Sequence, residues 1–365
     1  MLTPFLSRRS FGDLPGWADG DHRDALAAFQ RSAARFLADA VDTGSLGIKA
    51  EAFRPAASAS LAADPKDARA FFETHFRPAF LSPQDLEGRG FLTGYYEPEV
   101  DAALVPDARF RFPLYRPPAD LVKVDDATRP QGLDQSFWFA RQDAEGVLDE
   151  YPDRGQIEAG YLAGRGLEIA WLDSPVDAFF IHIQGSARLR LADGRRLRVT
   201  YAAKTGHPFT AIGRLLVQEG ELTLAEADMD GIRAWLAAHP TRIRALLDRN
   251  RSFIFFREAV VEDESLGPVA AAKVPLTPMA SIAVDRLLHT FGTPFFIDAP
   301  DLSLGGPPFQ RLMIAQDTGS AILGPARADI FVGSGDSAGR LAGRVRHPGD
   351  FFVLLPTALF DELGG

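Results

Sequence analysis

Apolar residues recur three or four positions apart in several stretches of the chain, which is the spacing that predicts amphipathic helices. The pattern predicts one helix over residues 22–41 and a second that begins at Asp64-Pro65 and ends before Pro78. Further segments between residues 210 and 250 show the same spacing. Helices are therefore predicted in the N-terminal part of the chain and again in its middle.

Short apolar runs bounded by glycine, proline or aspartate predict strands elsewhere. The clearest hairpin is centred on Ala192-Asp193-Gly194, which separates runs at 188–191 and 197–202. The other predicted strands lie at 90–100, 167–172, 177–183, 253–256, 281–284, 294–297, 312–315, 330–332 and 351–355. The predicted fold class is mainly β with peripheral helices.

The composition changes near residue 103, where prolines between Pro106 and Pro130 divide the chain into short extended pieces. A length of 365 residues suits about two domains. The prediction is one domain formed by residues 1–102 and 246–365, with N-terminal helices. Residues 103–245 are predicted to form an inserted β domain with trailing helices.

Composition and charge exclude several classes of function. The chain has no cysteine, so disulfides, thiolate nucleophiles and cysteine-ligated metals are excluded. The net charge is −10 and no run of Lys or Arg stands out, which argues against nucleic acid or an anionic membrane surface as the main partner. The sequence contains no HExxH, P-loop or strand-linked GxGxxG motif, so neither a metal nor a cofactor is expected.

Two aspartates stand where apolar runs meet turn residues. Asp317 opens an Asp-Thr-Gly-Ser turn, and Asp329 directly precedes a second apolar run. Aspartate often only caps a turn, but loops held by strands also carry catalytic groups. Asp329 has apolar neighbours on both sides and is the better proton donor, because burial raises the pKa of a carboxyl group. Asp317 is expected to accept hydrogen bonds and to stay ionised.

Carboxylate chemistry suggests two enzyme classes. In glycoside cleavage, a carboxylic acid protonates the leaving oxygen. Aspartic proteolysis needs two Asp-Thr-Gly loops whose aspartates share one proton. A second copy of the motif does occur, at Asp42-Thr-Gly-Ser45, but the segment before Asp42 has helical spacing. The protease is therefore the weaker of the two alternatives.

Eight short motifs occur in one order along most of the chain. They are Leu14-Pro-Gly-Trp17, Gly94-Tyr-Tyr-Glu-Pro98, Ile183-Gln-Gly-Ser186, Gly206-His-Pro208, Val274-Pro-Leu-Thr-Pro278, Ala283-Val-Asp285 with Gly292-Thr-Pro294, Ala315-Gln-Asp-Thr-Gly319 and Asp329-Ile-Phe331. Each motif is unspecific alone, but in this order the set resembles the lytic murein transglycosylase A family. One departure is Ser320, where the family usually has a second glycine.

The resemblance implies a fold and a set of site residues. The fold is a double-psi β-barrel domain plus a second, inserted β domain, with a substrate groove between them. The C-terminal part resembles the family's three-aspartate domain, with Asp329 as the catalytic residue and Asp317 and Asp285 as supporting residues. The substrate-binding residues that it implies are Thr93, Tyr95, Tyr96, Glu97, Gln184, Gly185, Ser186, His207 and Thr318.

The implied reaction is that of a carbon–oxygen lyase acting on peptidoglycan. Asp329 gives its proton to the β-1,4 glycosidic oxygen between N-acetylmuramic acid and N-acetylglucosamine. It then takes the proton of the muramyl C6 hydroxyl, which attacks C1 and leaves a 1,6-anhydromuramyl end. One carboxylate suffices because the nucleophile belongs to the substrate. The alternatives are the aspartic protease and a non-catalytic glycan-binding scaffold.

The resemblance also implies partners and a location. The partners are peptidoglycan glycan strands and, by extension, proteins of cell-wall synthesis or division, with a monomer as the default state. The implied location is the periplasm of a Gram-negative bacterium, in association with the outer membrane. The sequence as given begins without an apolar export segment or a lipidation cysteine, so this location follows from the resemblance alone.

Overall fold

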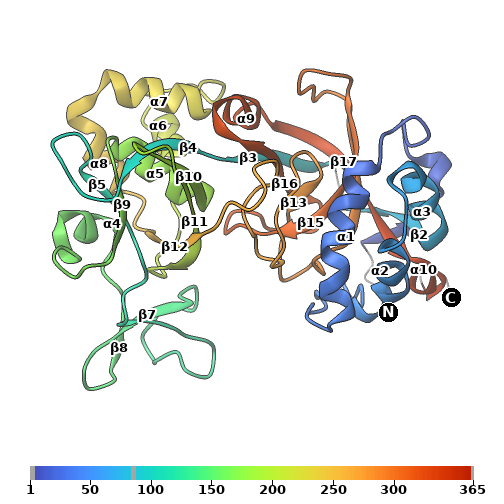
Figure 1. Cartoon of the computed structure of the whole chain (residues 1–365), viewed down its shortest axis with the longest axis horizontal. Coiled ribbons are helices and arrows are strands. Elements are labelled where there is room, and N and C mark those ends of the chain that lie inside the picture. Colours follow the sequence, from blue (N-terminus) through green and yellow to red (C-terminus); the bar gives the residue numbers. More distant parts are fainter. Residues whose placement is uncertain (1–4, 84–87, 363–365) are drawn as a thin grey trace. The chain divides into compact units, whose positions relative to one another are not determined.

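The computed structural model describes residues 5–83 and 88–362, and the chain divides into two compact units. The first unit is formed by both ends of the chain, Met1–Tyr96 and Asp263–Gly365. The second unit, Glu97–Glu262, is inserted between these two segments in the sequence, which the colours of Figure 1 follow. The fold is mainly β with several helices, as the apolar pattern predicts.

The first unit is organised around an eight-stranded sheet with the order β1-β2-β17-β14-β15-β13-β16-β3. Because β17 also pairs with β3, the strands from β17 to β3 form a closed circuit, and β2 and β1 extend it from β17. Closure leaves no free edge within the circuit. The strands are β1 (Leu6–Arg8), β2 (Phe76–Leu81), β3 (Gly90–Glu97), β13 (Ser281–Ala283), β14 (Pro294–Ala299), β15 (Phe309–Asp317), β16 (Arg327–Ser334) and β17 (Arg346–Pro356).

Helices cover part of this sheet. The predicted helix at 22–41 is confirmed as α1, whose apolar side buries Leu26 and Phe29. The predicted second helix is confirmed as η3 and α3, which end at His75, before Pro78; Pro78 belongs to β2 and lies opposite Leu354 of β17. The helical segments are η1 (Phe11–Asp13), α1 (Arg23–Leu37), η2 (Ala50–Phe53), α2 (Arg54–Ser60), η3 (Pro65–Asp67), α3 (Ala68–His75), α9 (Gly335–Ala342) and α10 (Thr357–Glu362).

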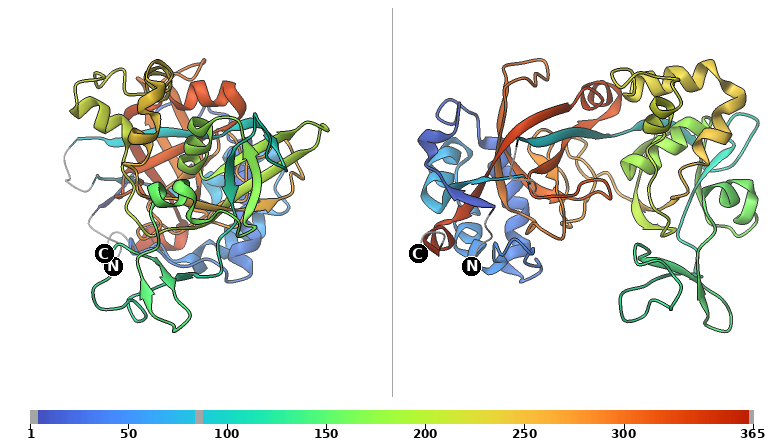
Figure 2. Two further views of the ribbon diagram at one scale, coloured as in Figure 1. Left: turned by 90° about the vertical axis from the view of Figure 1, so that its left-hand side faces the viewer. Right: turned by 180° about the vertical axis from the view of Figure 1, so that it is seen from behind.

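The second unit contains two sheets. A six-stranded sheet has the order β12-β11-β10-β4-β9-β5, and a three-stranded sheet, β6-β7-β8, stands apart from it in both Figure 1 and Figure 2. The predicted domain boundaries, after 102 and after 245, fall inside this unit, because β4 and β12 pair with its strands. The strands are β4 (Glu99–Ala103), β5 (Phe112–Tyr115), β6 (Leu121–Lys123), β7 (Phe139–Gln142), β8 (Leu148–Asp149), β9 (Glu168–Leu172), β10 (Ser186–Leu191), β11 (Arg196–Lys204) and β12 (Ile254–Ala259).

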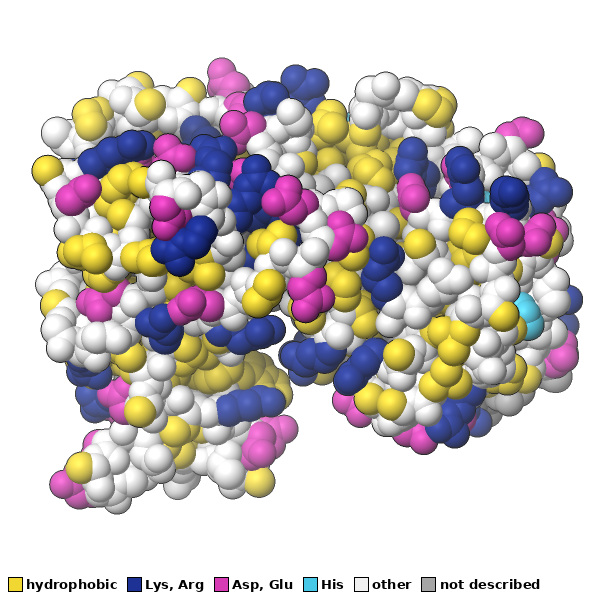
Figure 3. All heavy atoms as spheres, viewed as in Figure 1, with side chains coloured by type: hydrophobic (Ala, Val, Ile, Leu, Met, Phe, Trp, Pro, Cys, Tyr) yellow, Lys and Arg dark blue, Asp and Glu magenta, His cyan; other side chains and the backbone are white. Residues whose placement is uncertain are grey.

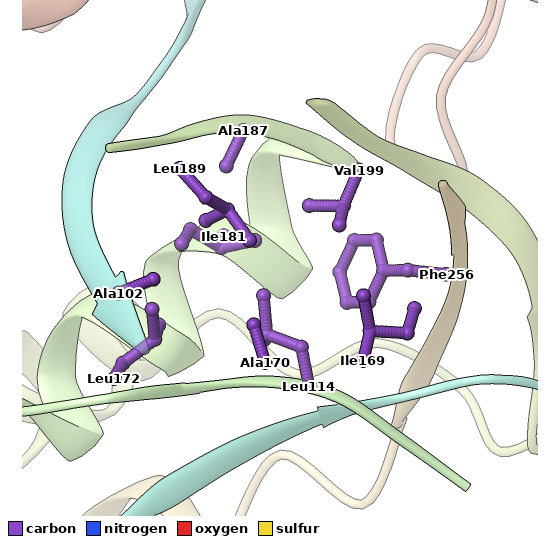
Figure 4. Close-up of a cluster of buried hydrophobic side chains, with 10 residues drawn as sticks. All are labelled: Ala102, Leu114, Ile169, Ala170, Leu172, Ile181, Ala187, Leu189, Val199 and Phe256. Atoms are coloured by element: carbon purple, nitrogen blue, oxygen red, sulfur yellow. The ribbon is translucent and has the colours of Figure 1, made fainter. Parts of the chain in front are cut away.

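The core of the second unit explains one wrong prediction. The segment at 177–183, predicted as a strand, lies in helix α5 (Pro175–Gln184), which Ser174 caps and which Gly185, at φ 78°, ends. Ile181 of α5 packs with side chains from all six strands of the larger sheet (Figure 4). Other apolar residues of α5 pack against α6, α7 and α8. A helix buried on two sides has a continuous apolar run that resembles a buried strand.

The remaining helices of the second unit confirm the helical spacing between residues 210 and 250. The residues around Ile157 form a single α-helical turn followed by a π-helical one. The helices are α4 (Arg154–Gln156), η4 (Ile157–Tyr161), α6 (Ile212–Gln218), α7 (Met229–Ala238), η5 (Pro240–Arg242) and α8 (Ile243–Leu247). No helix in the described part of the chain is both long and apolar enough to cross a membrane.

Charged side chains are mixed on the surface, and a cluster of three charged side chains is buried in the second unit. On the face drawn in Figure 3, Lys or Arg and Asp or Glu side chains are interspersed. In the second unit, the fully buried carboxylate of Glu97 accepts from Arg188 Nε at 2.8 Å and from Arg198 Nε at 2.7 Å. Both arginine side chains are also buried. Each buried charge therefore depends on its partners.

Replacing Glu97 by alanine is expected to destabilise the protein by about 3–5 kcal/mol, because two buried guanidinium groups lose this carboxylate. Asp101→Ala is the matched control, since Asp101 lies on the next strand, β4, and its side chain pairs with arginines while 46% exposed. The control is expected to cost about 1 kcal/mol or less. Urea unfolding followed by circular dichroism measures both, and equal losses would contradict the structural role of Glu97.

Candidate active site

Asp329 is the third residue of β16, which lies between β13 and β3 in the sheet of the first unit. Its partner across the ladder in β13 is Ala283. The sequence pattern predicted that Asp329 lies where a turn meets a strand, and this prediction is wrong. The strand begins earlier, at Arg327, and just before it the Phe91 amide of β3 donates to Ala326 O. Asp329 is therefore held by strands on both sides.

The two carboxylate oxygens of Asp329 have different surroundings. Thr93 Oγ1 on β3 donates to Asp329 Oδ1 at 2.8 Å. In the described part of the chain, Oδ2 accepts no hydrogen bond, and it is not among the fully buried polar atoms. The side chain as a whole is half-buried. One oxygen is thus held by Thr93, and the other has no hydrogen-bond partner in the described part of the chain.

Asp317 lies at the end of β15, beside Asp329. Tyr95 Oη on β3 donates to Asp317 Oδ2 at 2.9 Å, and the Ala271 amide donates to Oδ1 at 3.2 Å. Thr93 and Tyr95 are two residues apart on one strand, so their side chains lie on the same face. The Tyr95 ring also contacts the Phe331 ring, with centroids 5.3 Å apart. Asp317 is therefore bound through both oxygens, unlike Asp329.

Burial raises the pKa values of both carboxyl groups. For Asp329 burial raises the pKa from 3.8 to about 6, against the opposing effects of the Thr93 hydrogen bond and the Arg327 charge, and the Asp317 charge adds to the rise. Burial also raises the pKa of Asp317, which the Thr318 amide, the Tyr95 hydroxyl and the Ala271 amide oppose. The expectation of an elevated pKa is confirmed for Asp329. A carboxyl group with a pKa near 6 can both give and take a proton close to neutral pH.

The other predicted residues of the first unit lie on supporting structure. Asp285 is buried and accepts from the amides of Leu287 at 3.0 Å and Gly324 at 2.9 Å. Thr318 Oγ1 donates to Val284 O at 2.9 Å. Tyr96 is buried on the face of β3 opposite to Tyr95, against α9, where a Cβ on Gly339 would lie 2.8 Å from its ring. The structure thus brings together Thr93, Tyr95, Asp317 and Asp329.

The remaining predicted residues belong to the second unit. Gln184 is the last residue of α5, Gly185 caps that helix, and Ser186 is buried at the start of β10. His207 is fully buried, and its Nε2 lies 2.7 Å from Tyr151 O. Glu97 contacts Arg188 and Arg198 in the buried ion pairs described above. Neither Glu97 nor His207 presents its side chain to solvent.

The second Asp-Thr-Gly-Ser copy has a different setting from the first. Asp42 is exposed and lies in irregular chain after α1, whereas Asp317 ends a strand. An aspartic protease needs two equivalent strand-end loops. The geometry of Asp42 therefore gives the protease alternative no support.

Metal binding can be assessed over the described residues. Among residues 5–83 and 88–362, no group of three or more His, Asp or Glu side chains is arranged to hold a metal ion.

Sequence reasoning missed Arg327. Its Nη2 donates to Thr93 Oγ1 at 2.7 Å, so it contacts the residue that holds Asp329. The available signal was the spacing Arg-Ala-Asp, because residues two apart on a strand share a face. The interpretation of Asp329 as the first residue of its strand hid this relation.

Comparison with known proteins decides the family. Residues 91–257 match the family model of the MltA specific insert domain, and residues 280–355 match that of the 3D domain. The membrane-bound lytic murein transglycosylase A of Escherichia coli (strain K12) is 32% identical to this chain over 277 residues, 74% of this chain and 67% of the relative. This chain belongs to the lytic murein transglycosylase A family. The motif resemblance is thereby confirmed.

Solved structures of the family share the fold. A membrane-bound lytic murein transglycosylase from Agrobacterium tumefaciens is 49% identical, with a TM-score of 0.91 over 98% of this chain and 99% of that one. The E. coli MltA structure with bound chitohexaose is 26% identical, with a TM-score of 0.68 over 97% and 92% of the two chains. Thr93 and Tyr95 fall in the first family match, and Asp317 and Asp329 fall in the second.

Asp329→Asn is expected to stabilise the protein at alkaline pH. Because the folded pKa is raised from 3.8 to about 6, the folded state binds the proton more tightly, and stability falls as pH rises through this range. Asparagine cannot ionise and does not incur this loss. The expected gain is about 3 kcal/mol at pH 8, and it disappears below about pH 4.

Urea unfolding at a series of pH values measures this gain. The matched control is Asp336→Asn, because Asp336 is exposed, and the change is expected to stay within about 0.5 kcal/mol at every pH. A constant difference between Asp329→Asn and the parent protein from pH 4 to pH 8 would contradict the raised pKa.

Proposed function

We propose that this chain is a lytic transglycosylase of peptidoglycan. It cleaves the β-1,4 bond between N-acetylmuramic acid and N-acetylglucosamine and leaves a 1,6-anhydromuramyl end. The observation that carries the proposal is the half-buried Asp329, which has one oxygen held by Thr93, the other open, and a pKa near 6. Family membership supports the substrate class, since the curated relatives are named lytic murein transglycosylases.

In the proposed reaction, protonated Asp329 acts first as an acid. Its proton moves to the glycosidic oxygen as the bond from that oxygen to the muramyl C1 breaks. The resulting carboxylate then removes the proton of the muramyl C6 hydroxyl, and the C6 oxygen bonds to C1. Asp329 ends protonated again, and no water is consumed. A single carboxyl group with a pKa near the working pH serves both steps.

The neighbouring carboxylates have supporting parts in this proposal. Asp317 is bound by Tyr95 and the Ala271 amide, and its negative charge helps to keep the pKa of Asp329 high. Asp285 holds the Gly324 and Leu287 amides, which fixes the loop before β16. Neither residue needs to exchange a proton with the substrate.

Several finer features remain part of the proposal. The closed circuit of strands from β17 to β3 supports a double-psi β-barrel. The glycan would contact Tyr95 and Thr318 near the carboxylates, and a groove shared with the inserted domain stays a prediction. So do the substrate roles of Tyr96, Gln184, Gly185 and Ser186. Glu97 and His207 would act only through the structure around them, because both are fully buried.

The location and partners follow from the family. The relatives are named membrane-bound, and we propose a periplasmic protein associated with the outer membrane. The proposed ligand is the peptidoglycan glycan strand, and the chitohexaose bound by the E. coli relative supports a site for a linear β-1,4 glycan. Binding to proteins of cell-wall synthesis or division, and a monomeric state, stay predictions.

Purified peptidoglycan sacculi provide the decisive substrate. The protein is expected to release muropeptides with 1,6-anhydromuramyl ends, which are identified by mass spectrometry. Asp329→Asn is expected to lower the rate by about a thousandfold or more, because the only group assigned to both proton transfers is lost. Reducing-end products would instead identify a hydrolase, and binding without release would identify a scaffold.

The pH dependence tests the assigned acid. Because Asp329 must begin protonated and its pKa is about 6, kcat/KM is expected to be flat at low pH. Above pH 6 it is expected to fall by about tenfold per pH unit. The measurement is the rate of anhydromuropeptide release between pH 4.5 and 8.5. A rate that rises above pH 7 would contradict the role of Asp329 as the acid.

A further inference from the structure

A hydrogen-bonded chain of three residues ends at Asp329 and is not explained by the reaction itself. Arg327 Nη2 donates to Thr93 Oγ1 at 2.7 Å, and Thr93 Oγ1 donates to Asp329 Oδ1 at 2.8 Å. The guanidinium also donates from Nη1 to Ala328 O and lies over the Phe91 ring, 5.6 Å from its centroid. Arg327 is half-buried, so these contacts hold it in place.

The donor and acceptor capacities of the three groups fix the direction of this chain. A guanidinium group has donors and no acceptor, whereas a hydroxyl group has one hydrogen and two lone pairs. Since Thr93 Oγ1 accepts from Arg327, its own hydrogen is available for Asp329 Oδ1. The adjacent positive charge makes the hydroxyl a stronger donor, and bonds to charged groups are the stronger ones. Oδ1 is therefore an acceptor, and the exchangeable proton belongs on Oδ2.

We propose that Arg327 is a positioning residue for catalysis, which acts through Thr93 to place the catalytic proton of Asp329 on Oδ2. Oδ2 is the oxygen without a partner in the described chain, and it is therefore the one that can reach a glycosidic oxygen. The inference rests on the proposed function, because it concerns the same proton transfer. Without Arg327 the Thr93 hydroxyl can turn, and the Asp329 proton distributes over both oxygens.

The other charged groups around Asp329 set the background for this effect. Asp317 at the end of β15 and Tyr95 on β3 face it, its ladder partner in β13 is the uncharged Ala283, and Arg327 lies on its own strand. Tyr95 stays protonated, because burial raises the pKa of Tyr95 well above its ordinary value. Asp317 and burial favour the protonated form of Asp329, whereas Thr93 and Arg327 favour the carboxylate. Loss of either partner therefore raises the pKa of Asp329.

Two variants break this series of hydrogen bonds at different residues. Arg327→Met and Thr93→Val are each expected to lower the kcat/KM for anhydromuropeptide release by about tenfold or more at low pH, as one bond to the reacting group is lost. Both are expected to move the midpoint of the pH profile upward by about one unit. The double variant is expected to lower this kcat/KM no further than Thr93→Val, because Arg327 places the proton through Thr93, although its charge also lowers the pKa of Asp329 directly. A role in folding alone would lower the rate without moving the midpoint.

Conservative variants and an exposed arginine supply the controls. Thr93→Ser keeps the hydroxyl and is expected to keep the parent midpoint, and Arg327→Lys keeps the charge and is expected to give a smaller shift than Arg327→Met. Arg340→Met, at an exposed arginine of α9, is expected to leave both rate and midpoint unchanged. The carbon-13 shift of the Asp329 carboxyl group, titrated in the free protein, reports the same midpoints without any turnover.

The outcomes separate this inference from the proposed function. If the parent protein releases no anhydromuropeptides, or Asp329→Asn retains activity, the proposed function fails. If Asp329 is required but Arg327→Met and Thr93→Val leave both midpoints at the parent value, the positioning role of Arg327 is refuted. A rate loss in the double variant larger than that of Thr93→Val would also refute it, because Arg327 would then act without Thr93.

Discussion

The partial burial of one carboxyl group, Asp329, is the constraint on which the active site depends. Burial disfavours the charged form and raises its pKa to about 6, where one group can act as acid and then as base. The surrounding contacts keep this effect within useful limits. Thr93 supplies one hydrogen bond to the carboxylate, and the Asp317 charge opposes ionisation from the other side. An aspartate that was fully exposed, or whose two oxygens both accepted hydrogen bonds, would have a lower pKa.

The strands of the closed sheet provide the rigidity that such a balance needs. Thr93 and Tyr95 lie on β3, and each holds one of the two carboxylates. Gly94, between them, lies so close to α9 that an added Cβ would be 2.8 Å from Ala342 O. The backbone of β3 therefore packs directly against the helix that follows β16. This close contact holds the β3 backbone in place, and with it the Thr93 and Tyr95 side chains that bond to the carboxylates.

The sequence predicted the mainly β fold class and indicated Asp329 as the residue proposed to be catalytic, but it did not predict the contacts around that residue. Periodicity was sufficient for α1, where one buried face repeats every turn. It failed for α5, because a helix buried on two sides shows no polar face. The motifs indicated Asp329, but the partners that tune it depend on strand pairing. Arg327 becomes relevant only once β16 and β3 lie side by side, and a single sequence does not show which strands pair.

The first unit is assembled from both ends of the chain, and this order has a consequence for synthesis. The residues that hold the two carboxylates precede them by 236 and 222 positions. The whole second unit is made between the two sets. The ribosome therefore completes the inserted unit before either carboxylate exists, and a chain interrupted anywhere before β16 lacks Asp329, the proposed proton donor. The proposed catalytic residue is therefore made only after the whole inserted unit.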